Sequence, residues 1–190
     1  MGLWGAIAAD RGDLFVTNNY GNTVTEINAA TGAPVNVLSG SSYGFDGPTG
    51  ITSDGTHVWV TNEFSGETPH GSVTELNAAT RSLVKVLSAP RDKFSEPTGI
   101  ASDGTHVWVA DSGRRGPGQS VTELNAATGT LVKVLTAPPY EFDSPQDLAS
   151  DGTNVWVTNG AGDSVTEFPL PQSKPINSPA ETLQSPGIRL

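Results

Sequence analysis

Residues 53–62 read SDGTHVWVTN, and the chain repeats this phrase with small changes. The other copies are SDGTHVWVAD from Ser102, SDGTNVWVTN from Ser150 and a looser ADRGDLFVTN from Ala9. A Val-Thr-Glu step follows each copy, beginning at Val24, Val73, Val121 and Val165. The aromatic residues of successive copies are 44 to 49 residues apart. A period of this length is typical of stacked units of supersecondary structure.

All the length variation between repeats falls in one loop. From each of the first three Val-Thr-Glu steps to the aromatic residue of the next copy the distance is always 35 residues. From the aromatic residue to the following Val-Thr-Glu step it varies between 9 and 14 residues. Each unit therefore has a rigid part and one loop that is free to change.

Turn residues divide each repeat into four short strands. In the second copy we expect strands at 50–53, 57–61, 72–77 and 83–87. The Asp54-Gly55 turn between the first two favours a tight hairpin. Val58 and Val60 point to one side of the second strand and Trp59 to the other, so this strand needs apolar cover on both faces.

These features predict an all-β fold, a β-propeller of four-stranded antiparallel blades with about four blades in this chain. A β-helix is the alternative, although its rungs are usually shorter, and no helical period supports an α-solenoid. The expected blades are 5–38, 48–87, 97–135 and 145–168, before a Pro/Ser-rich tail at 169–190. We expect a four-bladed ring closed by residues 180–184. A half-ring that dimerises and a piece of a longer array remain open.

The repeat resembles a known family. Phe15-Val16-Thr17-Asn18, Trp59-Val60-Thr61-Asn62 and Trp156-Val157-Thr158-Asn159 are similar to the YVTN-type β-propeller repeat, with Phe or Trp in place of Tyr. The third copy differs, with Ala110-Asp111 where Thr-Asn is expected. The resemblance covers about residues 5–168 and implies a propeller. Streptogramin-lyase-like propellers share this general architecture, but no motif here carries over their catalytic residues.

Composition and net charge limit the kinds of partner and binding site that we expect. The formal charge of −10 argues against nucleic acid or an anionic membrane as the main partner, because binding to phosphate depends on clustered Lys and Arg. The chain has no Cys, which excludes disulfides and thiolate metal sites. Met1–Asp10 lacks the pattern of a signal peptide, so we expect a soluble protein, cytoplasmic or secreted.

Sequence differences between the repeats collect on one predicted face. In a propeller the loop after the second strand and the connection after the fourth emerge together, and these are the segments that vary. We expect this face to bind a protein, peptide or glycan, without a cofactor or metal. The candidates are residues that do not recur between copies, namely Tyr43, Glu63, Phe64, His70, Lys93, Asp111, Arg114, Arg115 and Tyr140.

Recurring residues are expected to be structural. Phe45, Phe94 and Phe142 should plug the connections, and His57 and His106 should supply hydrogen bonds beside a turn. Strand register places Glu75 near Lys85, and Glu123 near Lys133 in the next copy. The favoured function is a non-catalytic binding module. The alternatives are a lyase or hydrolase that uses His70 and Glu63, and a structural piece of a larger propeller.

Overall fold

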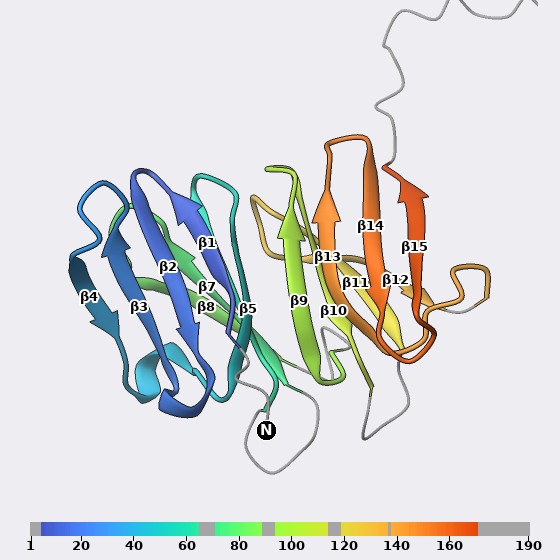
Figure 1. The fold of residues 1–190 in the computed structure, drawn as a ribbon, viewed down its shortest axis with the longest axis horizontal. Coiled ribbons are helices and arrows are strands. Elements are labelled where there is room, and N and C mark those ends of the chain that lie inside the picture. Colours follow the sequence, from blue (N-terminus) through green and yellow to red (C-terminus); the bar gives the residue numbers. More distant parts are fainter. Residues whose placement is uncertain (1–4, 65–70, 89–93, 114–118, 137, 171–190) are drawn as a thin grey trace, which may run out of the picture.

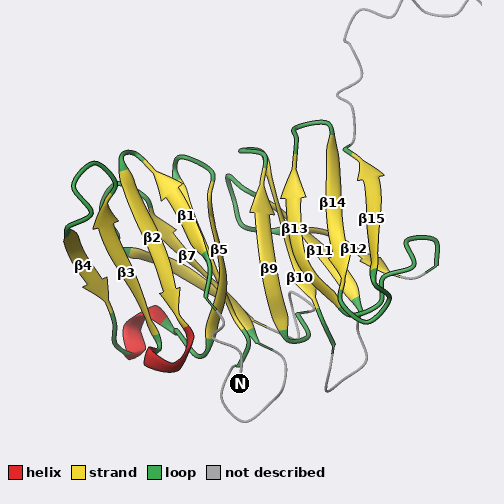
Figure 2. Cartoon of the chain, in the orientation of Figure 1, coloured by secondary structure: helices red, strands yellow, loops and turns green. Residues whose placement is uncertain are grey.

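The structure is a computed structural model, which describes residues 5–64, 71–88, 94–113, 119–136 and 138–170. Apart from two short 3-10 turns, η1 (Asn19–Gly21) and η2 (Ser41–Tyr43), all its regular elements are β-strands (Figure 2). In chain order the strands are β1 (Ile7–Asp10), β2 (Asp13–Asn18), β3 (Thr23–Asn28), β4 (Pro34–Leu38), β5 (Pro48–Ser53), β6 (His57–Asn62), β7 (Ser72–Asn77), β8 (Leu83–Ser88), β9 (Pro97–Ser102), β10 (His106–Asp111), β11 (Ser120–Asn125), β12 (Leu131–Thr136), β13 (Pro145–Ser150), β14 (Asn154–Asn159) and β15 (Ser164–Pro169). No helix among the described residues has the length and apolar character needed to cross a membrane.

The strands form four separate antiparallel sheets, one for each repeat. Blade 1 is β1-β2-β3-β4, blade 2 is β5-β6-β7-β8 and blade 3 is β9-β10-β11-β12, while blade 4 has three strands, β13-β14-β15, within the described residues. The first strands of consecutive blades, β1, β5, β9 and β13, lie side by side (Figure 1). This is the blade arrangement of a β-propeller, so the predicted fold class is confirmed.

Each second strand is buried on both faces, as its sequence requires. On β6, Val58 and Val60 pack toward blade 1, whereas Trp59 packs toward blade 3. Burial of one large apolar side chain stabilises a fold by about 1.5–3 kcal/mol. This strand therefore gains stability from side chains on both of its faces. A strand of alternating Val and Trp is stable here only because sheets lie above and below it.

Three seams between blades are built in the same way. The earlier blade contributes an aromatic residue from its second strand and a Val from its third, which we call the outgoing half. The following blade contributes Ile or Leu from its first strand, two Val from its second and an apolar residue from its third, which we call the incoming half. The outgoing pairs are Phe15 and Val24, Trp59 and Val73, and Trp108 and Val121. All six of these side chains have no exposed area.

The two ends of the array are not covered in this way. Trp156 and Val165 form the outgoing half of blade 4 and are 38% and 61% exposed. Ile7, on the incoming half of blade 1, is 61% exposed. The described residues therefore form an open arc, and the closed four-bladed ring expected from the sequence is wrong for them. Residues 180–184, expected to close the ring, lie outside the described residues.

Threonines and glycines hold the first strands together near the axis. The Thr17 hydroxyl donates to the carbonyl of Thr49 on the next blade at 3.0 Å, and Thr61 donates to that of Thr98 at 2.6 Å. A Cβ at Gly50 would collide with the same Thr98 carbonyl and would lie 2.8 Å from the Thr61 hydroxyl. The close approach of these strands thus explains why the second repeat has Gly at this position.

Candidate functional site

The connection between blades and the variable loop lie on the same face of the arc. The amide of Glu63, in the variable loop of blade 2, donates to the carbonyl of Gly47 in the connection before it, at 3.0 Å. Gly160 and Ser144 are joined in the same way in blade 4, at 2.9 Å. We call this side the variable face and the opposite side, formed by the Asp-Gly and Asn-Ala-Ala-Thr turns, the constant face. In Figure 1 the variable face is the lower edge and the constant face the upper one.

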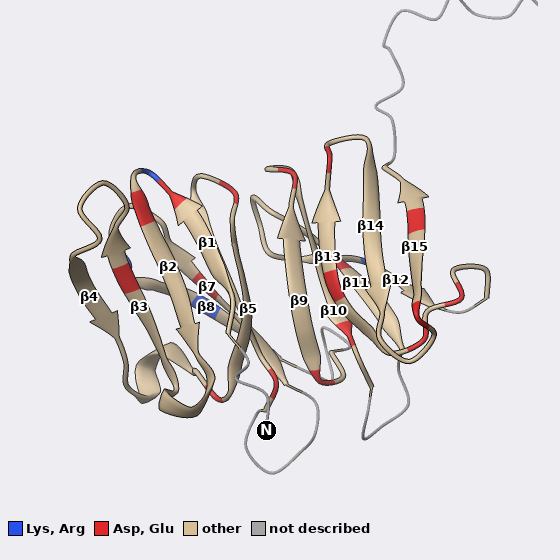
Figure 3. Ribbon diagram, viewed as in Figure 1, with Lys and Arg blue, Asp and Glu red and all other residues tan. Residues whose placement is uncertain are grey.

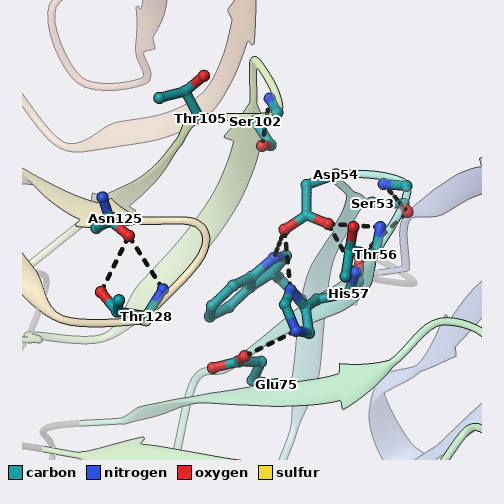
Figure 4. A network of polar contacts seen from close by, with 12 residues as sticks. Ser53, Asp54, Thr56, His57, Glu75, Ser102, Thr105, Asn125 and Thr128 are labelled. Atoms are coloured by element: carbon teal, nitrogen blue, oxygen red, sulfur yellow. Dashed lines mark hydrogen bonds and ion pairs between the residues drawn. The ribbon is translucent and has the colours of Figure 1, made fainter.

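Polar groups of the constant face are engaged with one another. Asp54 Oδ1 accepts from the amides of Thr56 and His57 at 2.8 and 2.6 Å, and its Oδ2 accepts from the Trp59 indole at 2.9 Å. The His57 ring lies between Asp54 Oδ2, 3.4 Å from Nδ1, and Glu75 Oε1, 3.5 Å from Nε2 (Figure 4). His57 is thus a structural link between the turn and the third strand, as predicted.

The expected cross-strand ion pairs are present, and in blade 2 they join an acidic position on β7 to a basic position on β8 (Figure 3). Lys85 Nζ lies 3.4 Å from Glu75 Oε2, and Lys133 Nζ lies 3.2 Å from Glu123 Oε2. Burial raises the pKa of Glu75, while Lys85 and His57 oppose that rise by favouring the carboxylate. These acids therefore support the sheets, and they do not form a ring of carboxylates open to a cation.

Tyr43 and Tyr140 lie on the variable face but are not singular residues. Each ring stacks on the plug phenylalanine two positions later, with centroids 5.4 Å apart in both pairs. Each backbone carbonyl also accepts a hydroxyl from the third strand of its blade, from Thr74 or Thr166. The shared Tyr-X-Phe spacing was the sequence signal for this bracing role.

Asp111 is a further exception among the candidates. Its side chain is completely buried at the end of β10, where the other blades have Asn. The carboxylate accepts from the hydroxyls of Thr122 and Ser120 at 2.7 and 3.3 Å and from the amide of Ser95 at 3.2 Å. Burial raises the pKa of Asp111 to about 7, and these three hydrogen bonds oppose the rise. Asp111 therefore anchors the base of the variable loop, and its assignment as a surface binding residue is wrong.

Glu63 and Phe64 start the variable loop of blade 2, and both side chains are half-buried. The Phe64 ring covers Gly47, where a Cβ would lie 2.6 Å from a ring carbon. The Gly47 amide in turn donates to Asn22 Oδ1 in the variable loop of blade 1, at 2.8 Å. Loops of neighbouring blades are thus tied into one surface. His70, Lys93, Arg114 and Arg115 lie outside the described residues.

A groove of about 170 Å³ runs between the first strands, near the ends that adjoin the variable face. Its lining residues are Gly5, Ala6, Thr49, Gly50, Thr98, Gly99, Gln146 and Asp147. Blades 2 and 3 contribute only Thr and Gly, whereas blade 4 contributes Gln146 and the exposed Asp147. These two side chains give one wall of the groove a distinct character. Neither residue was predicted from the sequence, although the change from Pro-Thr-Gly at 97–99 to Pro-Gln-Asp at 145–147 was a visible signal.

The described residues contain no cluster of three or more His, Cys, Asp or Glu side chains arranged to hold a metal ion. The predicted alternative of a lyase or hydrolase depends on His70 together with Glu63. Its histidine lies outside the described part of the chain, so that alternative stays a prediction.

No protein-family model matches the chain, and no curated protein matches it by sequence. Solved structures do match. A chain of the nidogen/laminin complex superposes with a TM-score of 0.67 at 19% identity, over 86% of this chain and 58% of that one. The WD40 β-propeller domain of Doa1 gives 0.61 at 13% identity, over 85% and 48%. The chain is a β-propeller by fold.

A streptogramin B lyase also superposes, with a TM-score of 0.57 at 17% identity, over 88% of this chain and 55% of the lyase. At such identities the likeness concerns the fold alone, because propellers carry many unrelated activities. The chain spans about half the length of these solved propellers.

Proposed function

We propose that the protein is a non-catalytic β-propeller module that binds a segment of another protein on its variable face. One observation carries the proposal. The segments that differ between repeats lie together on one face, while the opposite face consists of near-identical turns whose polar groups bond to one another. A scaffold requires the repeated residues, and a ligand is selected by the singular ones. We also infer, from the Phe/Trp-Val-Thr-Asn motif, that the repeats are of the YVTN type.

The groove between the first strands, which we call the axial groove, supplies the most specific contact points for such a ligand. Its Gly and Thr side chains leave backbone within reach, and the Asp147 carboxylate gives it a negative group at one wall. An extended peptide that carries a basic or amide side chain fits this chemistry, since a carboxylate accepts charge-assisted hydrogen bonds. Glu63 adds a second acid on the same face.

The test is a peptide array screened with the full chain, followed by affinity measurements on the peptides it selects. Asp147→Asn should weaken binding by at least about tenfold, since a charge-assisted contact is lost. The matched control is Ala127→Lys, which makes the same change of one unit in net charge on an exposed residue of the constant face. Equal effects of the two variants, or binding that only Ala127→Lys disturbs, would refute the proposal.

A further inference from the structure

We propose that the open ends of the arc bind one another in two copies of this chain, with blade 4 of each copy packed on blade 1 of the other. This interface adjoins the variable face, because its hollow shares Gly5 and Ala6 with the groove and reaches the loop at 19–21, but the proposal does not depend on the proposed function. The first observation is that each end presents one half of a seam. The outgoing half belongs to blade 4 and the incoming half to blade 1.

The outgoing half of blade 4 repeats that of blade 3. In blade 3 this half is buried under blade 4 and consists of Ala101, Trp108 and Val121. In blade 4 the corresponding residues are exposed, and they are Ala149, Trp156 and Val165. The exposed fraction is 38% for Trp156 and 61% for Val165. A Trp and a Val side by side in the open form an apolar surface of the kind that marks an interaction site.

The incoming half of blade 1 likewise repeats that of blade 2. On blade 2 the positions of Ile51, Val58 and Val60 are covered by blade 1 and are at most 6% exposed. Their counterparts on blade 1 are Ile7, which is 61% exposed, and Leu14 and Val16, which are partly exposed. A hollow of about 500 Å³ lies on this surface of blade 1. It is lined by Gly5, Ala6, Ile7, Val16, Thr17, Asn18, Asn19, Tyr20 and Gly21.

Polar groups at the two ends also match. In the seams between blades 1 and 2 and between blades 2 and 3, the Thr of the repeated motif donates to a carbonyl of the next blade, as Thr17 does to Thr49. Among the described residues, the Thr158 hydroxyl of blade 4 bonds only within its own blade, where it accepts from the Asp147 amide at 3.1 Å and donates to the Asp147 carbonyl at 3.3 Å. By register, Gly5 of blade 1 corresponds to Thr49, so its carbonyl is the acceptor that Thr158 would meet.

The occupant that fits is therefore a second copy, because it presents the missing half with the residue types already used at three seams. Blade 4 on blade 1 is a head-to-tail contact, and two such contacts close a dimer of eight blades, within the usual range for propellers. The charge of Glu167 opposes this dimer. Glu167 has the position that Glu123 has in blade 3, where Lys133 on the fourth strand pairs with it. The described part of blade 4 has no fourth strand to supply such a lysine.

The experiment is sedimentation of the full chain over a range of concentrations, with single variants at each half of the seam. The wild type should dimerise, and both Trp156→Asp and Ile7→Asp should raise the dimer dissociation constant by at least about tenfold, as a buried charge does at an interface core. Glu167→Gln should lower that constant, since it removes an acid without a cation beside it. Val35→Asp, on the exposed outer strand β4, is the control and should leave it unchanged.

Mixing the two seam variants gives the decisive result. Each variant alone has a charge in both seams, whereas a mixed dimer of Trp156→Asp with Ile7→Asp retains one seam of wild-type sequence. Association should therefore return on mixing. Circular dichroism and melting temperature check that both variants fold. A monomeric wild type, a dimer that Ile7→Asp leaves intact, or no recovery on mixing would overturn the proposal.

Discussion

Asp111→Asn should stabilise the protein at neutral and alkaline pH. Burial raises the pKa of Asp111 from 3.8 to about 7, so the folded chain holds a proton that the unfolded chain releases above pH 3.8. The contribution of this group to stability is therefore greatest below pH 3.8 and is lost as the pH rises through the window up to about 7. A shift of this size corresponds to about 4 kcal/mol between the two ends of that window.

Asparagine removes this cost because its site is already suited to an amide. In blade 2, Asn62 Nδ2 donates to the hydroxyls of Ser72 and Thr74, both at 3.1 Å, and its Oδ1 accepts from the amide of Asp46. Ser120, Thr122 and Ser95 offer the same set of groups around Asp111. The variant should thus gain on the order of 4 kcal/mol over the wild type at pH 8, and little near pH 4.

Urea unfolding of both proteins at pH 5, 6, 7 and 8 measures this difference. The free energy of unfolding of Asp111→Asn minus that of the wild type should grow steadily with pH. Asn62→Asp is the mirror control in blade 2 and should lose stability over the same window. A difference that is flat with pH, or a variant less stable than the wild type at pH 8, would show that the buried Asp111 carboxylate does not destabilise the fold.

Two further predictions concern the scaffold. Trp59→Phe removes the indole hydrogen bond to Asp54, whereas the Trp108 indole nitrogen has no partner among the described residues. In thermal or urea unfolding, Trp59→Phe should therefore lower the free energy of unfolding by about 1–2 kcal/mol more than Trp108→Phe does. Equal costs would show that the bond contributes nothing. Gly50→Ala forces a Cβ into the backbone of the next blade and should cost at least about 1–3 kcal/mol, while Gly21→Ala, whose nearest neighbour would be 3.5 Å away, should be close to neutral in the same assay.

Much of the fold could be predicted because the repeat fixes local geometry four times over. The Asp54-Gly55 turn, the alternation of Val58, Trp59 and Val60, and the pairing of Glu75 with Lys85 follow from strand period and register alone. These features depend on residues a few positions apart or directly opposite on neighbouring strands. Each of them is therefore encoded within a single blade.

Ring closure and part of the site were harder to predict, for physical reasons. Closure depends on the rotation between successive blades, which is summed over the whole array and has no signature in any one residue. Asp111 looked like a surface group because it differs from its counterparts, yet a buried position can also change when hydroxyl donors remain to satisfy it. Gln146 and Asp147 were overlooked because they lie at the start of a predicted blade, whereas the candidates were sought in the variable loops and the connections between blades.

Ligand recognition on the variable face can be located by amide hydrogen exchange of the full chain, measured with and without a peptide selected from the array. Protection should appear in the connections at 39–47 and 138–144 and along the axial groove, while the Asp-Gly and Asn-Ala-Ala-Thr turns exchange as before. Protection confined to those turns would place the ligand on the constant face instead.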